Sequence, residues 1–489
     1  MIVVYTFGLL YGLAMLFILV YSLAQAHLLS HFVRHKTKSD PPVSTIVANE
    51  HLPLVTVQLP IYNESYVVER LIDAVAAFNY PADRLQIQIL DDSTDLTCGL
   101  ILNKIEDYPE LDIQYLHRTG RQGFKAGALK EGLEKAKGEF IAIFDADFVP
   151  EPDFLRKTLL HFADPKVGMV QSRWTHLNRD YSLLTQLQAF ALDAHFLIEQ
   201  IGRNRQQAFM NFNGTGGIWR KTCILDAGNW QADTLTEDLD LSYRAQGRGW
   251  KFIYRPDIDS PAELPPVMSA IKSQQYRWTK GGAECARKHL RDVWRGDYPA
   301  KTKFHAFAHL LNSTVFVAVL LSSISSIPLW WAIKEDWIEP SFFRFGAIFF
   351  IGFVIIALVY LFAFYYSKGS FWRKSLQVAW KLPLFLSVSM GLSLHNSLAV
   401  VEGLVGKKTP FVRTPKFNLG QKNSHWKKNR YLSLKMPFVT LLEGFLSVIF
   451  LLIVLGSLNW GIYLMLPFHV MLAVGYGIVF YTSYKSYNL

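Results

Sequence analysis

The sequence predicts an α/β domain with a mostly parallel sheet, inserted between membrane-spanning helices. Apolar runs of about 20 residues, the length that crosses a bilayer as a helix, gather at the two ends of the chain. The middle instead alternates short apolar strands with amphipathic helices. The 489 residues are 51% hydrophobic but also 18% charged, which is unusual for a purely soluble protein and suits more than one domain.

The first apolar run, residues 2–32, is interpreted as a retained membrane anchor. A cleaved signal peptide is the alternative, but no basic residue precedes the apolar core and no small-residue cleavage site is obvious. Between Arg34 and Tyr298 no uncharged stretch is long enough to span a bilayer. Further candidate spans are residues 304–333, 342–366, 436–458 and 461–481.

Basic residues beside the spans predict the orientation. They follow the first and third candidate spans and fill the loop at 407–435, whereas the other two loops are mostly acidic or uncharged. We therefore expect a multi-pass protein of a bacterial inner membrane, a plasma membrane or an equivalent membrane. The expected parts are a transmembrane helix in 1–33, a cytoplasmic domain with interfacial helices in 34–300, and a membrane domain of about four spans in 301–489.

The segment 376–406 does not fit this scheme simply. It is apolar enough to span, but both of its ends carry the basic residues typical of the inside face. Lys381, Pro383, His395 and Asn396 also interrupt it. An interfacial or re-entrant helix is therefore expected here rather than a further span.

The net charge of +10 does not indicate a nucleic-acid partner. Much of the excess lies beside the membrane segments, where anionic lipids attract it, and no basic segment is interleaved with stacking aromatics. Cys98, Cys223 and Cys285 have no paired spacing. The cysteine pattern argues against a disulfide framework or a zinc site and suits a reducing cytosol.

The central domain has the alternation typical of a parallel sheet covered on both faces. Strands are expected at 55–59, 86–90, 113–116 and 140–144, and helices at 66–77, around 101–105 and at 125–136. Open α/β sheets bind ligands at the carboxyl ends of their strands. Acidic residues that directly follow a strand are therefore candidate site residues.

Asp145 and Asp147 follow the last of these strands and flank the small residue Ala146. Mg²⁺ and Mn²⁺ take oxygen ligands, often one or two carboxylates together with substrate phosphate oxygens. The pair therefore suits a metal–diphosphate site. Acidic residues after strands also cap helices and turns, so the motif alone does not decide between these roles.

Two earlier strands also end in polar residues. Asp91 and Asp92 suit a second metal pair or the recognition of a nucleoside, and equally an Asx turn with Ser93. Tyr62 and Glu64 follow the first strand and would lie at the same edge. Tyr62 suits packing against a base, or is simply a loop tyrosine.

Lys125 precedes a helix and follows two glycines. A lysine there reaches a phosphate together with the positive end of the helix dipole, although it is also explained as an exposed first-turn residue. Thr236, Glu237 and Asp238 precede a further helical stretch. Thr236 suits an N-cap, and Asp238 suits a general base that takes a proton from a sugar hydroxyl.

Gln274, Arg277 and Trp278 lie on a predicted amphipathic helix. Arg277 is suited to neutralising a departing diphosphate, and Trp278 to stacking on a sugar ring. The alternative is a helix that merely lies on the membrane, with Trp278 at the headgroup level.

The ordered set Asp-Asp, Asp-x-Asp, Thr-Glu-Asp and Gln-x-x-Arg-Trp resembles the family 2 processive glycosyltransferases. These include cellulose synthases, hyaluronan synthases and the plant cellulose-synthase-like mannan and glucan synthases, to which the resemblance is strongest. The runs shared with that plant branch include residues 91–93, 212–215, 263–265 and 274–278. The resemblance is dense over roughly 55–289 and looser over the membrane segments.

The resemblance implies a GT-A fold and an inverting, Mg²⁺- or Mn²⁺-dependent hexosyltransferase. Its partners would be a nucleotide-sugar donor such as UDP-glucose or GDP-mannose, a growing β-linked polysaccharide and membrane lipids, with export proteins unidentified. The basic stretch 407–430 would occupy the place of the family's cytoplasmic gating loop. By the same resemblance, the residues that contact the donor would be Tyr62, Glu64, Asp91, Asp92, Lys125, Asp145, Gln274 and Arg277. The metal would be held by Asp145 and Asp147, and the acceptor would contact Gly214, Thr215 and Trp278. Asp238 and Glu237 would be the catalytic residues.

Two other functions remain open from the sequence. Transfer of a single sugar to a lipid, such as ceramide or a polyprenyl phosphate, would need only a lateral opening to the membrane. A polymerase needs a path lined by polar and aromatic residues, for which Asn312, Trp330, His395 and Glu402 are candidates. A transporter with an inactive transferase domain would be expected to lack some of the catalytic carboxylates, and none is missing.

Overall fold

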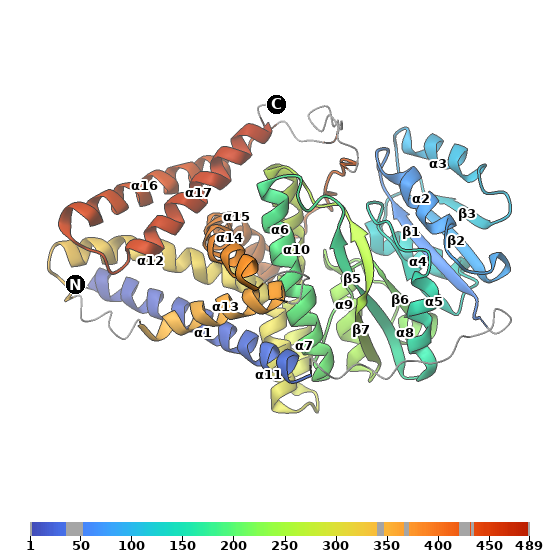
Figure 1. Cartoon of the computed structure of the whole chain (residues 1–489), viewed down its shortest axis with the longest axis horizontal. Coiled ribbons are helices and arrows are strands. Elements are labelled where there is room, and N and C mark those ends of the chain that lie inside the picture. Colours follow the sequence, from blue (N-terminus) through green and yellow to red (C-terminus); the bar gives the residue numbers. More distant parts are fainter. Residues whose placement is uncertain are drawn as a thin grey trace.

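The computed structural model describes residues 2–35, 52–339, 347–365, 371–419, 431 and 435–487. A sheet-containing domain lies beside a group of long helices (Figure 1). The sheet has seven strands in the order β3-β2-β1-β4-β6-β5-β7. Their bounds are β1 Val55–Ile61, β2 Leu85–Asp91, β3 Asp112–His117, β4 Phe140–Ile143, β5 Val167–His176, β6 Gly217–Arg220 and β7 Lys251–Ala262.

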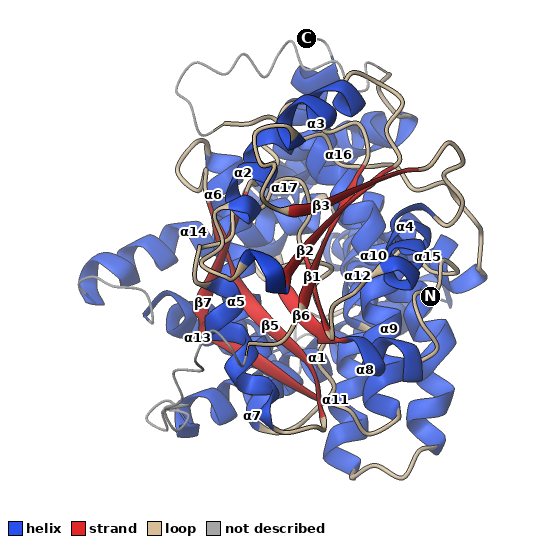
Figure 2. Ribbon diagram, turned by 90° about the vertical axis from the view of Figure 1, so that its right-hand side faces the viewer, coloured by secondary structure: helices blue, strands red, loops and turns tan. Residues whose placement is uncertain are grey.

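The predicted mostly parallel sheet is confirmed. β1 to β4 are parallel to one another, and β5 is parallel to β7, whereas β6 runs antiparallel to both β4 and β5. Helices cover both faces of the sheet (Figure 2), which explains why β1, β2 and β4 are almost entirely buried. This double burial accounts for the continuous apolar character of β4.

The helices of the domain fall between and after these strands. They are α2 Val68–Ala76, α3 Thr97–Ile105, α4 Phe124–Lys135, α5 Phe154–Leu159, α6 Leu183–Ala194, α7 Gln200–Arg205, α8 Lys221–Asp226, α9 Glu237–Gly247 and α10 Met268–Arg295. A short π-helical turn, His195–Glu199, joins α6 to α7. The remaining helices are α1 Ile2–His35, α11 Ala300–Leu310, α12 Val315–Lys334, α13 Ala347–Tyr365, α14 Phe371–Gly391, α15 Ser393–Val405, α16 Phe438–Trp460 and α17 Leu466–Tyr487.

Four described helices are long and apolar enough to cross a membrane: residues 2–34, 312–334, 438–460 and 466–487. The span expected from residue 304 is shorter than predicted, because α11 is a separate helix and a 3₁₀ turn precedes α12. Apolar residues continue across that break, so hydropathy alone does not reveal it. The segment expected at 342–366 contains a shorter apolar helix, 350–365.

The segment 376–406 falls on α14 and α15, two helices bent by 52° at a short break. Such a pair suits either a broken span or a re-entrant loop. Leu392 occupies the break, and α15 ends at Gly406, which has a φ of 83°. The expected interfacial or re-entrant helix therefore stays a prediction, now attached to a defined bend.

Helix α10 connects the sheet domain to the long helices. Its Lys272 Nζ lies 2.5 Å from Glu443 Oε2 on α16, and the same ammonium donates to Thr440 Oγ1 at 3.2 Å. Both charged side chains are almost fully buried. Each buried charge of such a pair depends on the opposite charge, so the pair fixes the position of α10 relative to α16.

Candidate active site

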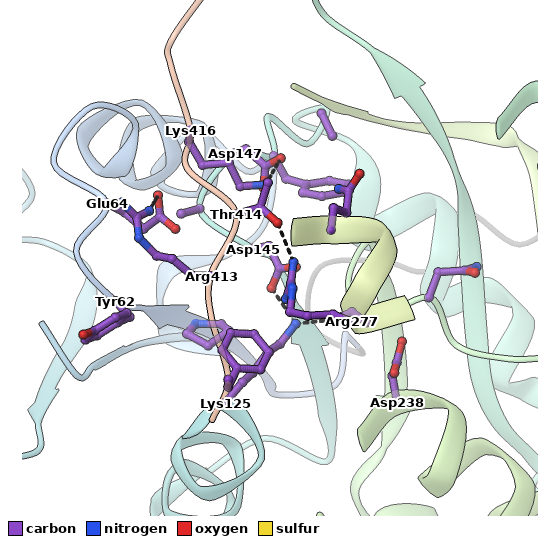
Figure 3. Close-up of a pocket in the computed structure, with 18 of the residues that line it drawn as sticks. Tyr62, Glu64, Lys125, Asp145, Asp147, Asp238, Arg277, Arg413, Thr414 and Lys416 are labelled. Carbon is purple, nitrogen blue, oxygen red and sulfur yellow. Dashed lines mark hydrogen bonds and ion pairs between the residues drawn. The ribbon is translucent and has the colours of Figure 1, made fainter. Parts of the chain in front are cut away.

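The predicted strand ends meet in one pocket at the carboxyl edge of the sheet. Helices α9 and α10 and the segment 411–416 close over it (Figure 3). The walls include the predicted residues Tyr62, Glu64, Asp92, Lys125, Asp145, Asp147, Gly214, Glu237, Asp238, Gln274, Arg277 and Trp278. Asp91 and Thr215 are fully buried and lie outside the walls.

Lys125 forms the positive centre of the pocket. Its Nζ lies 2.6 Å from Asp145 Oδ1 and 3.9 Å from Glu237 Oε1, and it donates to the Gly214 carbonyl at 2.9 Å. Burial opposes the charged form, but the neighbouring carboxylates, Asp145 first, raise the pKa of Lys125 above its ordinary value. The residue is thus a permanent cation placed in the first turn of α4, where phosphate groups are favoured.

Thr215 stabilises this arrangement from outside the pocket walls. Its hydroxyl accepts a hydrogen bond from the Asp145 backbone N–H at 2.9 Å, which fixes the turn after β4. The prediction that Thr215 contacts the acceptor is not matched by its position, because its side chain is covered. Gly214, its neighbour, does line the pocket.

Asp145 and Asp147 both face the pocket, and each is paired with a lysine. Asp147 Oδ2 lies 2.6 Å from Lys416 Nζ, as Asp145 does from Lys125. The donor set is made of oxygen alone and shares the pocket with groups suited to phosphate. These residues therefore fit a hard divalent cation of the Mg²⁺ or Mn²⁺ type, which would balance the charge of a diphosphate.

Asp238 lies in the first turn of α9, on the other side of the pocket from Asp147 (Figure 3). Burial raises the pKa of Asp238 to about 7, and the negative charge of Glu237 acts in the same direction, whereas Lys125 opposes it. Burial likewise raises the pKa of Glu237. A carboxyl group with a pKa near neutrality suits proton transfer at physiological pH.

Asp91 and Asp92 have different surroundings. Asp92 lines the pocket and makes a bidentate ion pair with Arg118, at 2.7 Å to Nε and 2.6 Å to Nη2. Asp91 accepts from the Tyr115 hydroxyl at 2.7 Å and from the Ser93 N–H at 2.9 Å. The bond to Ser93 is the Asx turn that the sequence left open, so direct donor contact remains a proposal for Asp92 alone.

Tyr62 and Glu64 are each covered by an arginine. The Arg121 guanidinium lies 3.4 Å from the centre of the Tyr62 ring, and Arg413 Nη1 lies 2.6 Å from Glu64 Oε2. Burial raises the pKa of Glu64 to about 7, although Arg413 favours its charged form. A base entering this side of the pocket would meet a Tyr–Arg stack, which is a suitable surface for an aromatic ring.

Helix α10 supplies the opposite wall with Gln274, Arg277 and Trp278. Arg277 Nη2 donates to Thr414 Oγ1 at 2.8 Å, and its guanidinium lies 4.7 Å from the Phe411 ring centre. Burial lowers the pKa of Arg277, and the pocket carboxylates oppose this. Because the pKa of arginine starts far above neutrality, the group remains a cation available to a leaving diphosphate.

Four basic residues at the site were not assigned a role from the sequence. Arg118, Arg121, Arg413 and Lys416 each cover a pocket carboxylate or ring, as described above. The stretch 407–430 was expected to be a gating loop, and residues 411–416 of its described part lie across the pocket (Figure 3). The rest of the predicted 407–430 stretch, residues 420–430, lies outside the described residues. A signal for Arg118 was its position directly after a strand, at the same edge as Asp92.

Comparison with known proteins defines the class of this domain. Residues 53–281 match the family described as "Glycosyltransferase like family 2". This part of the chain is therefore a family 2 glycosyltransferase domain, and with its sheet topology it has a GT-A fold. The expected family and fold are confirmed.

Plant relatives match the same region. The chain is 43% identical over 281 residues to "Probable glucomannan 4-beta-mannosyltransferase 4" of Oryza sativa subsp. japonica, covering 56% of this chain and 50% of the relative. It is 41% identical over 285 residues to "Glucomannan 4-beta-mannosyltransferase 2" of Arabidopsis thaliana, covering 56% of this chain and 52% of the relative. The aligned region thus spans about half the length of these curated relatives.

A solved structure supports the fold over a larger part of the chain. Mannosyltransferase PcManGT from Pyrobaculum calidifontis, in complex with GDP-Man and Mn²⁺, has a TM-score of 0.54 and 20% sequence identity. The match covers 82% of this chain and 100% of PcManGT. At this identity the likeness shows the fold.

Proposed function

We propose that the protein is an inverting β-glycan synthase that transfers mannose from GDP-mannose to the growing end of a polysaccharide. One observation carries the proposal: Asp238, Lys125, Asp145 and Arg277 line a single pocket of a family 2 domain. The plant relatives are named glucomannan 4-β-mannosyltransferases, and this favours mannose over glucose as the transferred sugar.

In the proposed reaction Asp238 removes the proton from an acceptor hydroxyl as its oxygen attacks the anomeric carbon. The bond from that carbon to the diphosphate breaks in the same step, so an α-linked donor gives a β-linked product. Lys125 and Arg277 take up the negative charge that develops on the leaving diphosphate. A divalent cation held by Asp145 and Asp147 would add further charge stabilisation to that group.

The donor and acceptor are proposed to enter from different sides of this pocket. The guanosine would lie toward Tyr62 and Asp92, because both line the pocket directly after the carboxyl ends of β1 and β2. The acceptor would lie against Gly214 and Trp278, beside the helix that leads to the membrane segments. Transfer would then extend the chain at the end that lies in the pocket, and we propose that the older part of the chain is translocated toward the membrane segments as it grows.

The proposal also places the protein in a membrane with its catalytic domain in the cytoplasm. The basic residues of the described segment 407–416 include Arg413 and Lys416, which contact pocket carboxylates. The segment therefore lies on the same side as the pocket, and basic loops are typical of the cytoplasmic side.

A radiolabel assay on membranes that contain the full chain tests this function. GDP-mannose and UDP-glucose are offered in parallel with Mg²⁺, with Mn²⁺ or with a chelator, and product is divided into polymer and organic-soluble lipid. Asp238→Asn is the test variant. Asp226→Asn is the matched control, because Asp226 is an exposed acid that pairs with Arg248 on the domain surface.

We expect high-molecular-weight label from GDP-mannose that is lost with Asp238→Asn or chelator and kept with Asp226→Asn. Polymer made from UDP-glucose instead would retain the synthase and change the sugar. Label found only in organic-soluble lipid would contradict a polymerase and leave transfer of a single sugar.

A further inference from the structure

A cluster of soft and hard metal-type ligands lies at the outer edge of the sheet, behind the pocket. Asp91 ends β2, Cys98 lies in the first turn of α3, and His117 ends β3. These elements form the side of the domain farthest from the long helices (Figure 1). Among the described residues this is the one group of three His, Cys, Asp or Glu ligand atoms that lie within 4.8 Å of one another.

The distances are close to those of a metal site. Asp91 Oδ2 lies 3.2 Å from His117 Nδ1, and the Cys98 sulfur lies within 4.8 Å of both. A tetrahedral zinc ion with Zn–S near 2.3 Å and Zn–N or Zn–O near 2.1 Å separates its ligand atoms by about 3.3–3.6 Å. The Asp–His pair already has nearly this spacing, so the sulfur alone has to approach, by at most about 1 Å.

We propose that Asp91, Cys98 and His117 form a zinc-binding site that is separate from the metal–diphosphate site of the pocket. Thiolate and imidazole ligands favour zinc, whereas Mg²⁺ and Ca²⁺ require oxygen ligands. Three protein ligands leave a fourth position for water, and His117, with 34% of its side chain exposed, provides the opening. The absence of paired cysteines does not argue against such a site, because it uses a single cysteine.

The surrounding residues hold the ligands in place. The Ser93 N–H donates to Asp91 Oδ1 at 2.9 Å, which leaves Oδ2 for the metal. The Tyr115 hydroxyl donates to Oδ2 at 2.7 Å, and such a bond orients a carboxylate ligand. The Cys98 thiol donates to the Ser93 carbonyl at 3.4 Å, so it already points toward this corner of the domain.

Zinc binding requires the thiolate form of Cys98. Burial and the Asp91 carboxylate raise the pKa of the Cys98 thiol above its ordinary value. The thiol therefore keeps its proton without metal and releases it to solvent when the sulfur–zinc bond forms. Zinc affinity should accordingly increase with pH.

The site is coupled to donor binding through the chain itself. Asp91 precedes Asp92, and His117 precedes Arg118, which makes the bidentate ion pair with Asp92 in the pocket wall. The Arg118 N–H also donates to the Asp91 carbonyl at 2.9 Å. A zinc ion bound to Asp91 and His117 would restrain the backbone at both members of the pair and oppose the adjustment that a bound donor requires of Asp92, so zinc should weaken donor binding.

Cobalt binding to the purified full chain in detergent tests the site without use of the enzymatic reaction. Excess Mg²⁺ is present to occupy the pocket, and Co²⁺ replaces Zn²⁺ as a spectroscopic probe. We expect a thiolate-to-cobalt charge-transfer band that zinc abolishes and that Cys98→Ser lacks. Loss of a ligand should weaken binding by more than the roughly 10- to 100-fold seen for an outer partner. The control is Cys223→Ser, whose thiol is buried elsewhere in the core.

His117→Gln provides a second variant at an exposed position, in case Cys98→Ser does not fold. A missing charge-transfer band, or one that both variants retain, would overturn the site.

In the transfer assay zinc should raise the donor KM of the wild type and not that of Cys98→Ser. If zinc inhibits both equally, it acts at the pocket carboxylates, and the proposed coupling is refuted. The cobalt spectrum does not depend on the sugar or the product, so its failure is distinguishable from failure of the proposed function.

Discussion

The pKa of Asp238 predicts a specific pH dependence of sugar transfer. Burial and the Glu237 charge raise that pKa to about 7, and only the ionised carboxylate accepts a proton. The ionised fraction is then about one-tenth at pH ~6 and about nine-tenths at pH ~8. We therefore expect kcat/KM, which reports ionisation of the free enzyme, to rise about tenfold over this interval. An aspartate with an ordinary pKa would be fully ionised throughout and would give a flat profile.

Two variants identify the group responsible. Asp238→Asn should lower kcat by about 10²- to 10⁴-fold. The residual rate should lack the fall toward acidic pH, which is the acid limb of the profile. Glu237→Gln removes a negative charge that raises the pKa of Asp238, so the limb should move to lower pH. Since the two carboxyl groups interact, the observed pKa belongs to the pair.

The assay is initial-rate transfer from GDP-mannose at donor concentrations well below KM, with pH varied in buffers of constant ionic strength. Asp226→Asn serves as the control and should keep the wild-type profile, because its exposed ion pair lies on the surface. A flat wild-type profile would refute the assignment of Asp238 as the base. So would an unchanged acid limb in Asp238→Asn.

Three further predictions concern stability and geometry. Asp238→Asn should raise the melting temperature most at pH ~8 and have little effect at pH ~4, because a folded-state pKa above the ordinary value makes ionisation destabilising as pH rises; an equal change at both pH values would contradict this. Gly214→Ala should lower kcat by about 100-fold, because Gly214 has a φ of +81° and an added Cβ would lie 3.2 Å from Asp238 Oδ2; wild-type kcat in a folded variant would oppose it. Lys272→Met should cost about 3–5 kcal/mol in unfolding free energy by leaving Glu443 buried and unpaired. Adding Glu443→Leu should recover most of that loss, and an equally unstable double variant would argue against the pair.

Much of the sheet was predictable because its strands are marked by local patterns. β4 is a continuous apolar run and β2 alternates apolar residues with glutamines. Both are followed by aspartates, and parallel strands bring their carboxyl ends to one edge. The positions of Asp145 and Asp92 in the pocket follow from that rule. The antiparallel β6 was not predicted, since its four residues, Gly217–Arg220, carry no pattern that specifies direction.

The partners of the pocket carboxylates were harder to predict. Lys416 and Arg413 lie far along the chain from Asp147 and Glu64, and a basic loop has many equivalent residues. Which of them contacts the pocket depends on how the loop packs in three dimensions. Asp91 was difficult to predict for another reason. It is the same residue type as its pocket-lining neighbour, Asp92, but its own carboxylate takes part in a local turn and a buried hydrogen bond.

In the proposed membrane placement, helix α10 would make turnover dependent on the thickness of the surrounding lipid bilayer. Its 28 residues extend about 42 Å and carry Lys272, clamped to α16, only five positions before Arg277. A membrane that is too thin or too thick tilts or displaces spanning helices. Because Arg277 lies less than two helical turns from Lys272, a displacement of α16 would move the side of the pocket proposed to bind the diphosphate. Acyl-chain length should therefore act on turnover as directly as a substitution in the site. Detergent, which imposes no fixed thickness, would remove that constraint.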